Sequence, residues 1–210
     1  MTDKIHVFLM ICLIISFFPL GIKAGTGVGT AGAQFLKIGP GARVDGMGSA
    51  FSAIADDVTA VYWNPAGISQ LEGFNLSDTH TYWIADTRFN YLALATPVDS
   101  VNGTLGLSLT LLTMPEMQIT TYQQPDGTGL YYDARDSAVS LAYSRQIKTK
   151  SDNRKLFLGI NAKYIHQRIH HESAKGVAID VGTLYHTGWK DLRIGITFSN
   201  FGPDMHFSGP

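Results

Sequence analysis

Alternation between apolar and polar side chains dominates the chain after residue 72. From residue 105 to residue 111, leucine occupies every odd position, and glycine, serine or threonine occupies every even one. A period of two is that of a β-strand, whose successive side chains point to opposite faces. The pattern predicts seven strands, over Gly73–Trp83, Arg88–Val98, Thr104–Leu112, Ser137–Arg145, Leu156–His166, Val177–Tyr185 and Leu192–Ser199.

This pattern favours an all-β protein, and specifically a transmembrane antiparallel β-barrel. The non-apolar positions of the predicted strands carry glycine, serine, asparagine, aspartate, lysine and arginine, as expected of a wet or plugged lumen. A secreted soluble β-sandwich has the same alternation with its apolar face inward, so it stays open as an alternative. Aromatic residues near strand ends favour the barrel, because interfacial girdles lie there. They are Tyr82, Trp83, Tyr143, Tyr164, Tyr185 and Trp189.

The predicted connections differ in length, which suggests an orientation. The connections Met114–Asp136 and Gln167–Gly176 are expected to be long, and those around Asn153 and Gly188 are expected to be shorter. Barrels have short periplasmic turns and longer outer loops. Odd-numbered strands would therefore run outward, and the residues before the first strand would lie on the periplasmic side.

The number of predicted strands is odd, whereas bacterial single-chain barrels have an even number. The chain also ends without a final amphipathic strand that closes on an aromatic residue. We therefore expect residues 72–210 to be the first part of a barrel whose C-terminal part is missing from this sequence.

The N-terminus has the features of a secretion signal. Lys4 precedes an apolar run from Val7 to Leu20, and a small residue, Ala24, follows the run. A retained membrane helix needs about 20 apolar residues, which this interrupted run does not supply. The pattern predicts a signal peptide over residues 1–24, cleaved after Ala24. The one cysteine, Cys12, lies within it, so the exported protein would contain no disulfide.

Residues 25–71 match neither the signal nor the strands. Gly39, Gly41, Gly46 and Gly48 suit tight turns and close backbone approach. Pro65 keeps Asn64 out of the helical region, so a turn is expected to end whatever the residues from Ala50 to Tyr62 form.

Four blocks of this segment occur in a fixed order. The full set of family positions is Gly41, Arg43, Gly46, Met47, Gly48, Asp56, Asp57, Asn64, Pro65, Ala66 and Gly67. With Phe35-Leu36 before them and Tyr62-Trp63 before Asn64, they resemble the opening signature of the PorV/PorQ family of outer-membrane proteins. That family is related to the FadL-type transporters, which share the Asn-Pro-Ala-Gly element. The resemblance covers roughly 35 residues.

The resemblance implies a barrel of about fourteen strands when complete, with residues 25–71 as a plug. It implies an outer-membrane, non-enzymatic component of type IX protein secretion that shuttles cargo to the cell surface. The expected partners are outer-membrane lipid, secretion-system subunits and cargo C-terminal domains. The alternative from the same resemblance is FadL-like uptake of long-chain fatty acids, with a hydrophobic ligand in the lumen.

Other chemistry has weaker support in the sequence. Asp56 and Asp57 form an acid pair or a cation site, or else Arg43 pairs with one of them to hold the segment, which we favour. His166, His170 and His171 lack the cysteines or spaced carboxylates that would complete a metal site. We expect no cofactor, no metal and no enzymatic activity. The net charge of −1 gives no sign of nucleic-acid binding.

Overall fold

The structure, a computed structural model, describes residues 32–147, 149 and 153–207. The predicted signal peptide and its cleavage site lie outside the described residues. The described part from Gly32 onward forms a single compact unit.

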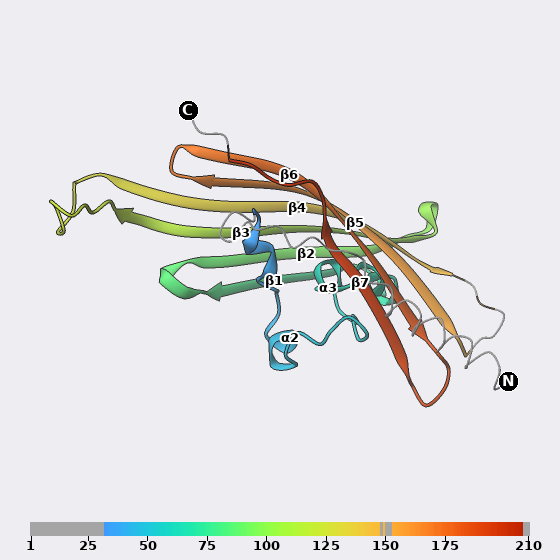
Figure 1. Cartoon of the computed structure of the whole chain (residues 1–210). Coiled ribbons are helices and arrows are strands. Elements are labelled where there is room, and N and C mark those ends of the chain that lie inside the picture. Colours follow the sequence, from blue (N-terminus) through green and yellow to red (C-terminus); the bar gives the residue numbers. More distant parts are fainter. Residues whose placement is uncertain (1–31, 148, 150–152, 208–210) are drawn as a thin grey trace, which may run out of the picture. The chain divides into compact units, whose positions relative to one another are not determined.

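In the described residues, seven antiparallel strands form one sheet in chain order, so the predicted all-β class is confirmed (Figure 1). Each consecutive pair of strands is hydrogen-bonded. The strands are β1 Asn75–Tyr82, β2 Arg88–Val98, β3 Gly103–Gln118, β4 Tyr131–Ile147, β5 Lys155–Ile169, β6 Glu172–His186 and β7 Arg193–Phe201. In the part of the chain described, β1 and β7 are edge strands that do not pair with each other. The sheet is therefore open, and barrel closure is not shown.

The central strands are longer than the alternation indicated, and this corrects the predicted loops. The connection between β5 and β6 consists only of His170 and His171, so the long loop expected over Gln167–Gly176 is wrong. Pairing continues to Ile169 opposite Glu172, and Arg168 forms an ion pair with Asp133 beyond the apolar positions. Because the residues at this end of β5 are polar, the alternation did not extend to them, although their backbone is paired in the sheet. Of the two long connections on which the predicted orientation depended, the described residues therefore contain only the one between β3 and β4.

The N-terminal segment, residues 32–71, contains four short helices. They are η1 Gln34–Lys37, α2 Ala42–Gly46, α3 Ala60–Trp63 and η2 Pro65–Gln70, and two further 3-10 turns, η3 Ile84–Asp86 and η4 Asp99–Val101, lie in strand connections. Among the described residues, no helix has the length and apolar character needed to cross a membrane.

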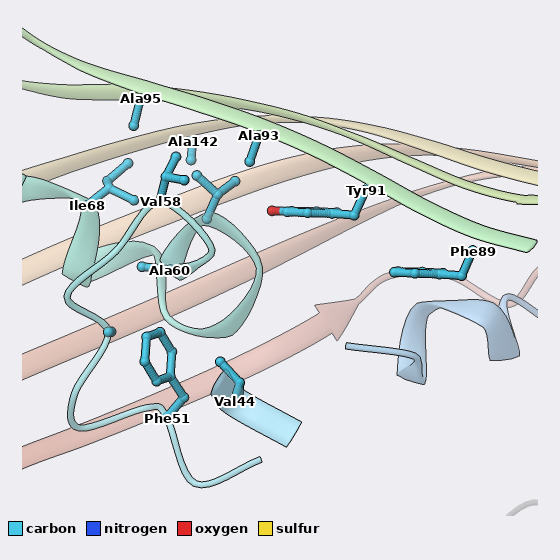
Figure 2. Packing of buried hydrophobic residues seen from close by; sticks show 12 residues of the cluster. Val44, Phe51, Val58, Ala60, Ile68, Phe89, Tyr91, Ala93, Ala95 and Ala142 are labelled. Atoms are coloured by element: carbon cyan, nitrogen blue, oxygen red, sulfur yellow. The ribbon is translucent and has the colours of Figure 1, made fainter. Parts of the chain in front are cut away.

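One face of the sheet, here called the inner face, is covered by the N-terminal segment. Figure 2 shows Val58 and Ile68 of this segment close to alanines of the strands, while Phe51 lies further from the sheet, beside Val44. On the inner face, β2 and β4 carry alanine at positions such as Ala93 and Ala142. Small side chains leave room for a second layer, which explains why an irregular segment can pack closely there. The main hydrophobic core therefore lies between this segment and the sheet.

The opposite face, here called the outer face, is apolar and uncovered. Leu141 is 59% exposed and Phe198 is 71% exposed. The outer-face positions of the central strands include Leu107, Val139, Leu158, Ile160, Val177, Ile179, Val181 and Ile196, all of which are exposed. A β-sandwich would bury such a face against a second sheet. The described residues form one sheet, and its apolar side chains point away from the core, unlike those of the sandwich alternative.

Candidate functional site: the N-terminal segment on the inner face

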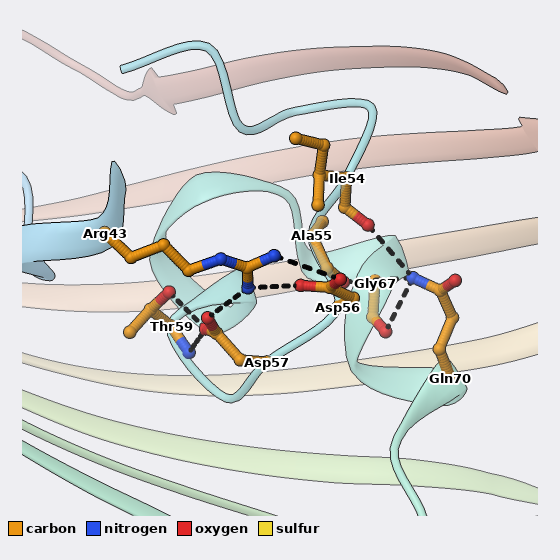
Figure 3. Close-up of polar contacts among 8 residues, drawn as sticks. All are labelled: Arg43, Ile54, Ala55, Asp56, Asp57, Thr59, Gly67 and Gln70. Carbon is orange, nitrogen blue, oxygen red and sulfur yellow. Dashed lines mark hydrogen bonds and ion pairs between the residues drawn. The ribbon is translucent and has the colours of Figure 1, made fainter. Parts of the chain in front are cut away.

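Arg43 joins the two adjacent aspartates of the N-terminal segment (Figure 3). Its Nη1 lies 2.6 Å from Asp56 Oδ1 and 3.1 Å from Asp57 Oδ2, and its Nη2 donates to Asp56 Oδ2 at 3.2 Å. The guanidinium also lies 5.3 Å from the centre of the Phe51 ring. One arginine therefore bridges both carboxylates, where the sequence analysis expected a pair with only one of them.

Both carboxylates have structural partners, which weakens the interpretation as an acid pair or a cation site. Asp57 Oδ1 accepts hydrogen bonds from the backbone N–H of Thr59 at 2.9 Å and from its hydroxyl at 2.5 Å. Hydrogen bonding to Arg43 holds the pKa of Asp56 below its ordinary value, against a smaller opposing effect of partial burial. Asp56 is therefore a stable carboxylate at neutral pH, and its charge is balanced by Arg43.

Asn64 is the central hydrogen-bonding residue of the N-terminal segment. It is extended (φ −159°, ψ 100°), as expected before Pro65, and α3 ends there. Its Oδ1 accepts from Ala66 N at 3.1 Å, and its Nδ2 donates to the carbonyl oxygens of Ser52 at 2.7 Å and Thr183 at 3.1 Å. The side chain thus starts η2 and ties the segment to β6.

Two glycines of the sheet make room for this element. Gly159 on β5 and Gly182 on β6 lie directly opposite each other. A Cβ at Gly159 would lie 2.3 Å from Ala66 N, and one at Gly182 would lie 2.1 Å from Asn64 Oδ1. The backbone of Asn64–Ala66 therefore rests on bare sheet backbone. Ser144 Oγ on β4 donates to the Ala66 carbonyl at 2.9 Å and holds the other side.

The remaining family positions have different reasons for their identity. Gly41 has a φ of +104°, a region that side chains disfavour, and a Cβ at Gly67 would lie 2.1 Å from the carbonyl oxygen of Ala55. Gly48 also has a positive φ, of +63°. Gly46 has neither feature, since a Cβ added there would have no neighbour within 4 Å. Met47 packs against the main core.

A buried polar cluster lies beneath the N-terminal segment. Lys163 on β5 and Asp180 on β6 form an ion pair of 2.7 Å, and their side chains are only 5% and 0% exposed. Asp180 also accepts from Asn161 Nδ2 at 2.9 Å and from the backbone N–H of Asn200 at 2.7 Å. Lys163 Nζ donates to Asn200 Oδ1 at 2.8 Å. The cluster links β5, β6 and β7 on the inner face.

This cluster also touches the N-terminal segment. Asn161 Nδ2 lies 3.2 Å from the carbonyl oxygen of Val61, and Lys163 Nζ lies 5.7 Å from the centre of the Tyr62 ring. The Tyr62 hydroxyl donates to the carbonyl oxygen of Leu36 at 2.7 Å. Burial, with a smaller contribution from the charge of Asp180, raises the pKa of Tyr62, so its hydroxyl stays a neutral donor. Polar contacts therefore fix the segment as well as apolar packing.

The site residues expected from the sequence do not include Gly159, Asn161, Lys163, Asp180 or Gly182. All five lie at the non-apolar positions of the alternating pattern in predicted strands. In the sequence, these residues stand out only as glycines and polar or charged residues within predicted strands. The sequence does not indicate which of them the N-terminal segment contacts.

The three histidines are not gathered into a metal site. His166 lies on β5, whereas His170 and His171 form the β5–β6 turn with ring centres 3.7 Å apart. Among the described residues, no group of three or more histidines, cysteines or acids is placed to hold a metal ion.

Comparison with known families gives one match. A family model described as "Uncharacterised protein family (UPF0164)" matches residues 21–163, which include the whole N-terminal segment and most of the strands up to β5. Comparison with curated proteins finds no match.

Proposed function

The chain belongs to the uncharacterised protein family UPF0164, and we propose that it forms the wall of an outer-membrane β-barrel whose interior holds the N-terminal segment. We further propose that it serves protein secretion as a binding component and catalyses no reaction. The observation that supports the barrel is the distribution of side chains on the two faces of the sheet. The outer face is apolar and uncovered, whereas the inner face is covered and carries small and polar side chains.

The outer face supports contact with lipid. Soluble proteins rarely leave a contiguous apolar patch of more than a few hundred Å² uncovered. Here exposed leucine, isoleucine, valine and phenylalanine side chains extend from β2 to β7. In a barrel such residues face the hydrocarbon core, where their exposure costs nothing.

The height of this apolar face also suits a membrane. Tyr185 lies opposite Leu156 at one end of β5, and Tyr164 lies eight residues further along the same face. At about 3.3 Å per residue these levels are about 26 Å apart along the strand, similar to the ~25 Å apolar band of outer-membrane barrels. Beyond Tyr164, the pairing sets three polar residues at one level, Ser137, His166 and Lys175.

The inner face supports a plug. A barrel interior must satisfy polar groups or be filled. The N-terminal segment does both here, because it buries Phe51 and Ile68 and also contacts Asn161 and Thr183 through hydrogen bonds. An open edge at β1 and another at β7 need further strands or a partner for closure.

The secretion role is supported by the resemblance of the N-terminal segment to the PorV/PorQ signature. The positions that carry this resemblance, among them Arg43, Asn64 and Gly67, lie in the contacts of the segment with itself and with the sheet. They act in holding the plug, so cargo contacts belong elsewhere on the molecule. Cargo C-terminal domains and secretion-system subunits are the proposed partners.

Nitroxide labels test the membrane assignment, because the exported protein would have no native cysteine. Leu141→Cys on the outer face should give a label accessible to oxygen but shielded from a water-soluble nickel complex in outer-membrane preparations. Tyr122→Cys, at a residue that is 98% exposed beyond the strands, is the control and should show the reverse. Equal access of nickel to both labels, or recovery of the protein in the soluble periplasm, would contradict the proposal.

Affinity purification from detergent-solubilised outer membrane tests the secretion role separately. We expect secretion-system subunits or cargo C-terminal domains to be recovered with the protein. A preparation that is embedded in the membrane but recovers neither would refute this role and leave the barrel intact. Labelled fatty-acid uptake in a deletion strain examines the transport alternative, and unchanged uptake would remove it.

A further inference from the structure

Three basic side chains lie side by side at one end of the inner face. Lys155 on β5 is paired directly with His186 on β6, and His186 is paired directly with Arg193 on β7. Residues directly opposite in an antiparallel sheet share one face, so the cationic side chains of Lys155 and Arg193 flank the His186 ring on that face. Among the described residues, neither Lys155 nor Arg193 has an ion-pair partner within 4.0 Å. The row therefore presents two positive charges that no carboxylate of the described residues neutralises at ion-pair distance.

The same three side chains line a cavity of about 120 Å³. Its other walls are Asn153, Gly188, Asp191 and Leu192. The two turns that enclose it are in close contact, because a Cβ at Gly188 would lie 2.4 Å from the carbonyl oxygen of Asn153. The cavity is thus framed by backbone and holds space for only a small ligand.

The polar groups around the cavity favour a negative ligand. Asp191 is the one acid in its lining, against Lys155, Arg193 and the imidazole of His186. Asp56 of the N-terminal segment lies within electrostatic range of Arg193, but it is already paired with Arg43. His186 Nε2 is buried and has no hydrogen-bond partner in the described part of the chain. The ring is held from one side by Phe157, with ring centres 5.2 Å apart.

We propose that this cavity binds a small oxyanion of the phosphate type, held by Lys155 and Arg193 with His186 between them. A doubly charged oxyanion would neutralise the row, accept charge-assisted hydrogen bonds from lysine and arginine, and offer a partner to the imidazole. The site does not depend on the membrane assignment. Its ligand is either free phosphate or the phosphate of a lipid headgroup, since both present anionic phosphate oxygens, with up to two negative charges on free phosphate near neutral pH and one on a headgroup diester.

Calorimetric titration of the purified protein with inorganic phosphate, at constant ionic strength, tests the site. We expect saturable binding at one site per chain. Lys155→Gln and Arg193→Gln should each weaken it about tenfold or more, because each removes a charge-assisted contact. Lys155→Arg keeps the charge and should retain most of the affinity, which separates loss of contact from loss of fold.

Lys190→Gln is the matched control. It removes one positive charge from the β6–β7 turn next to the cavity, but Lys190 lies against the Trp189 ring and does not line the cavity. Binding by this variant should equal that of the unchanged protein. No saturable binding by the unchanged protein, or equal weakening by Lys190→Gln and Lys155→Gln, would overturn the proposal.

A second arm separates the two sources of the phosphate group. The protein is reconstituted in phosphatidylcholine vesicles with or without phosphatidylglycerol, and the phosphate titration is repeated. Loss of phosphate binding only with phosphatidylglycerol would identify a lipid headgroup as the occupant. Equal binding in both vesicles would identify the free anion.

Discussion

At the scale of single residues, small side chains decide where the N-terminal segment can rest. Gly159 and Gly182 face each other on neighbouring strands; the backbone of Pro65 and Ala66 occupies the space of a side chain at Gly159, and the Asn64 side chain occupies that at Gly182. In contrast, Gly46 has no neighbour within 4 Å of the position a Cβ would take. Glycine is therefore required for close packing at Gly159 and Gly182, whereas packing does not require it at Gly46.

Replacing Gly159 by alanine should detach or strain the N-terminal segment. The new Cβ would meet the backbone of Pro65 and Ala66 at 2.3 Å, and backbone cannot rotate away as a side chain can. We expect a loss of about 1–3 kcal/mol in the free energy of unfolding, measured by urea titration of the purified protein.

Gly46→Ala is the matched control for that substitution. It adds the same methyl group in open space at the end of α2 and should leave stability unchanged or slightly increased. Equal stability of the Gly159 and Gly46 variants would show that the segment does not pack on β5 as described.

At the scale of elements, the covered face of the sheet is held by polar contacts as well as by apolar packing. The ion pair between Lys163 and Asp180 joins β5 to β6, and Asn200 extends the cluster to β7. A buried pair gives little net stability over an apolar pair, but removal of one partner leaves an unbalanced buried charge. The cluster therefore specifies which strands meet beneath the segment.

Lys163→Met should be strongly destabilising, because Asp180 would keep its charge with no cation beside it. We expect a loss of about 3–5 kcal/mol, followed by denaturant unfolding. The double variant Lys163→Met/Asp180→Asn should recover a large part of this loss, since no buried charge remains.

Lys175→Met provides the comparison for Lys163→Met. Lys175 is exposed on the outer side of β6, so its replacement should change stability by less than about 0.5 kcal/mol. If the double variant were no more stable than Lys163→Met alone, the ion pair would not be the source of the loss.

At the scale of the whole described unit, the polarity of the two faces determines what surrounds the protein. Leu141, Ile160 and Val177 are exposed on one face, while the other face is covered by the N-terminal segment. In water this arrangement would favour aggregation through the uncovered face. In a bilayer the same face is satisfied by lipid.

Leu141→Arg distinguishes these environments. If the outer face meets lipid, an arginine at the level of Ala162, inside the band but nearer its Tyr164 end, should cost a part of the about 2–4 kcal/mol expected at the midplane and should reduce folding into vesicles. In a water-exposed sheet the same change would be harmless or would increase solubility. The yield of protease-resistant protein after refolding into vesicles is the measurement.

Tyr122→Arg introduces the same side chain at a residue beyond the strands and should refold as the unchanged protein does. Unimpaired refolding of Leu141→Arg would contradict the lipid-facing assignment.

The amino-acid sequence by itself determined the number, order and approximate centres of the strands, since alternation is a local property set by the two-residue period of the backbone. It also placed the end of α3 at Asn64, because Pro65 restricts its neighbour directly. The ends of the strands were harder to predict from the sequence. Gln167 and Arg168 are polar, yet strand pairing continues through them.

Only the tertiary structure decided which face is covered, because alternation is the same whether the apolar side chains point toward a core or away from it. It also decided that Arg43 holds both aspartates, and that Asn64 rests against Gly182 from 118 positions earlier in the chain. Such contacts join residues far apart in sequence, and their partners become defined only when the sheet brings β5 and β6 beneath the N-terminal segment.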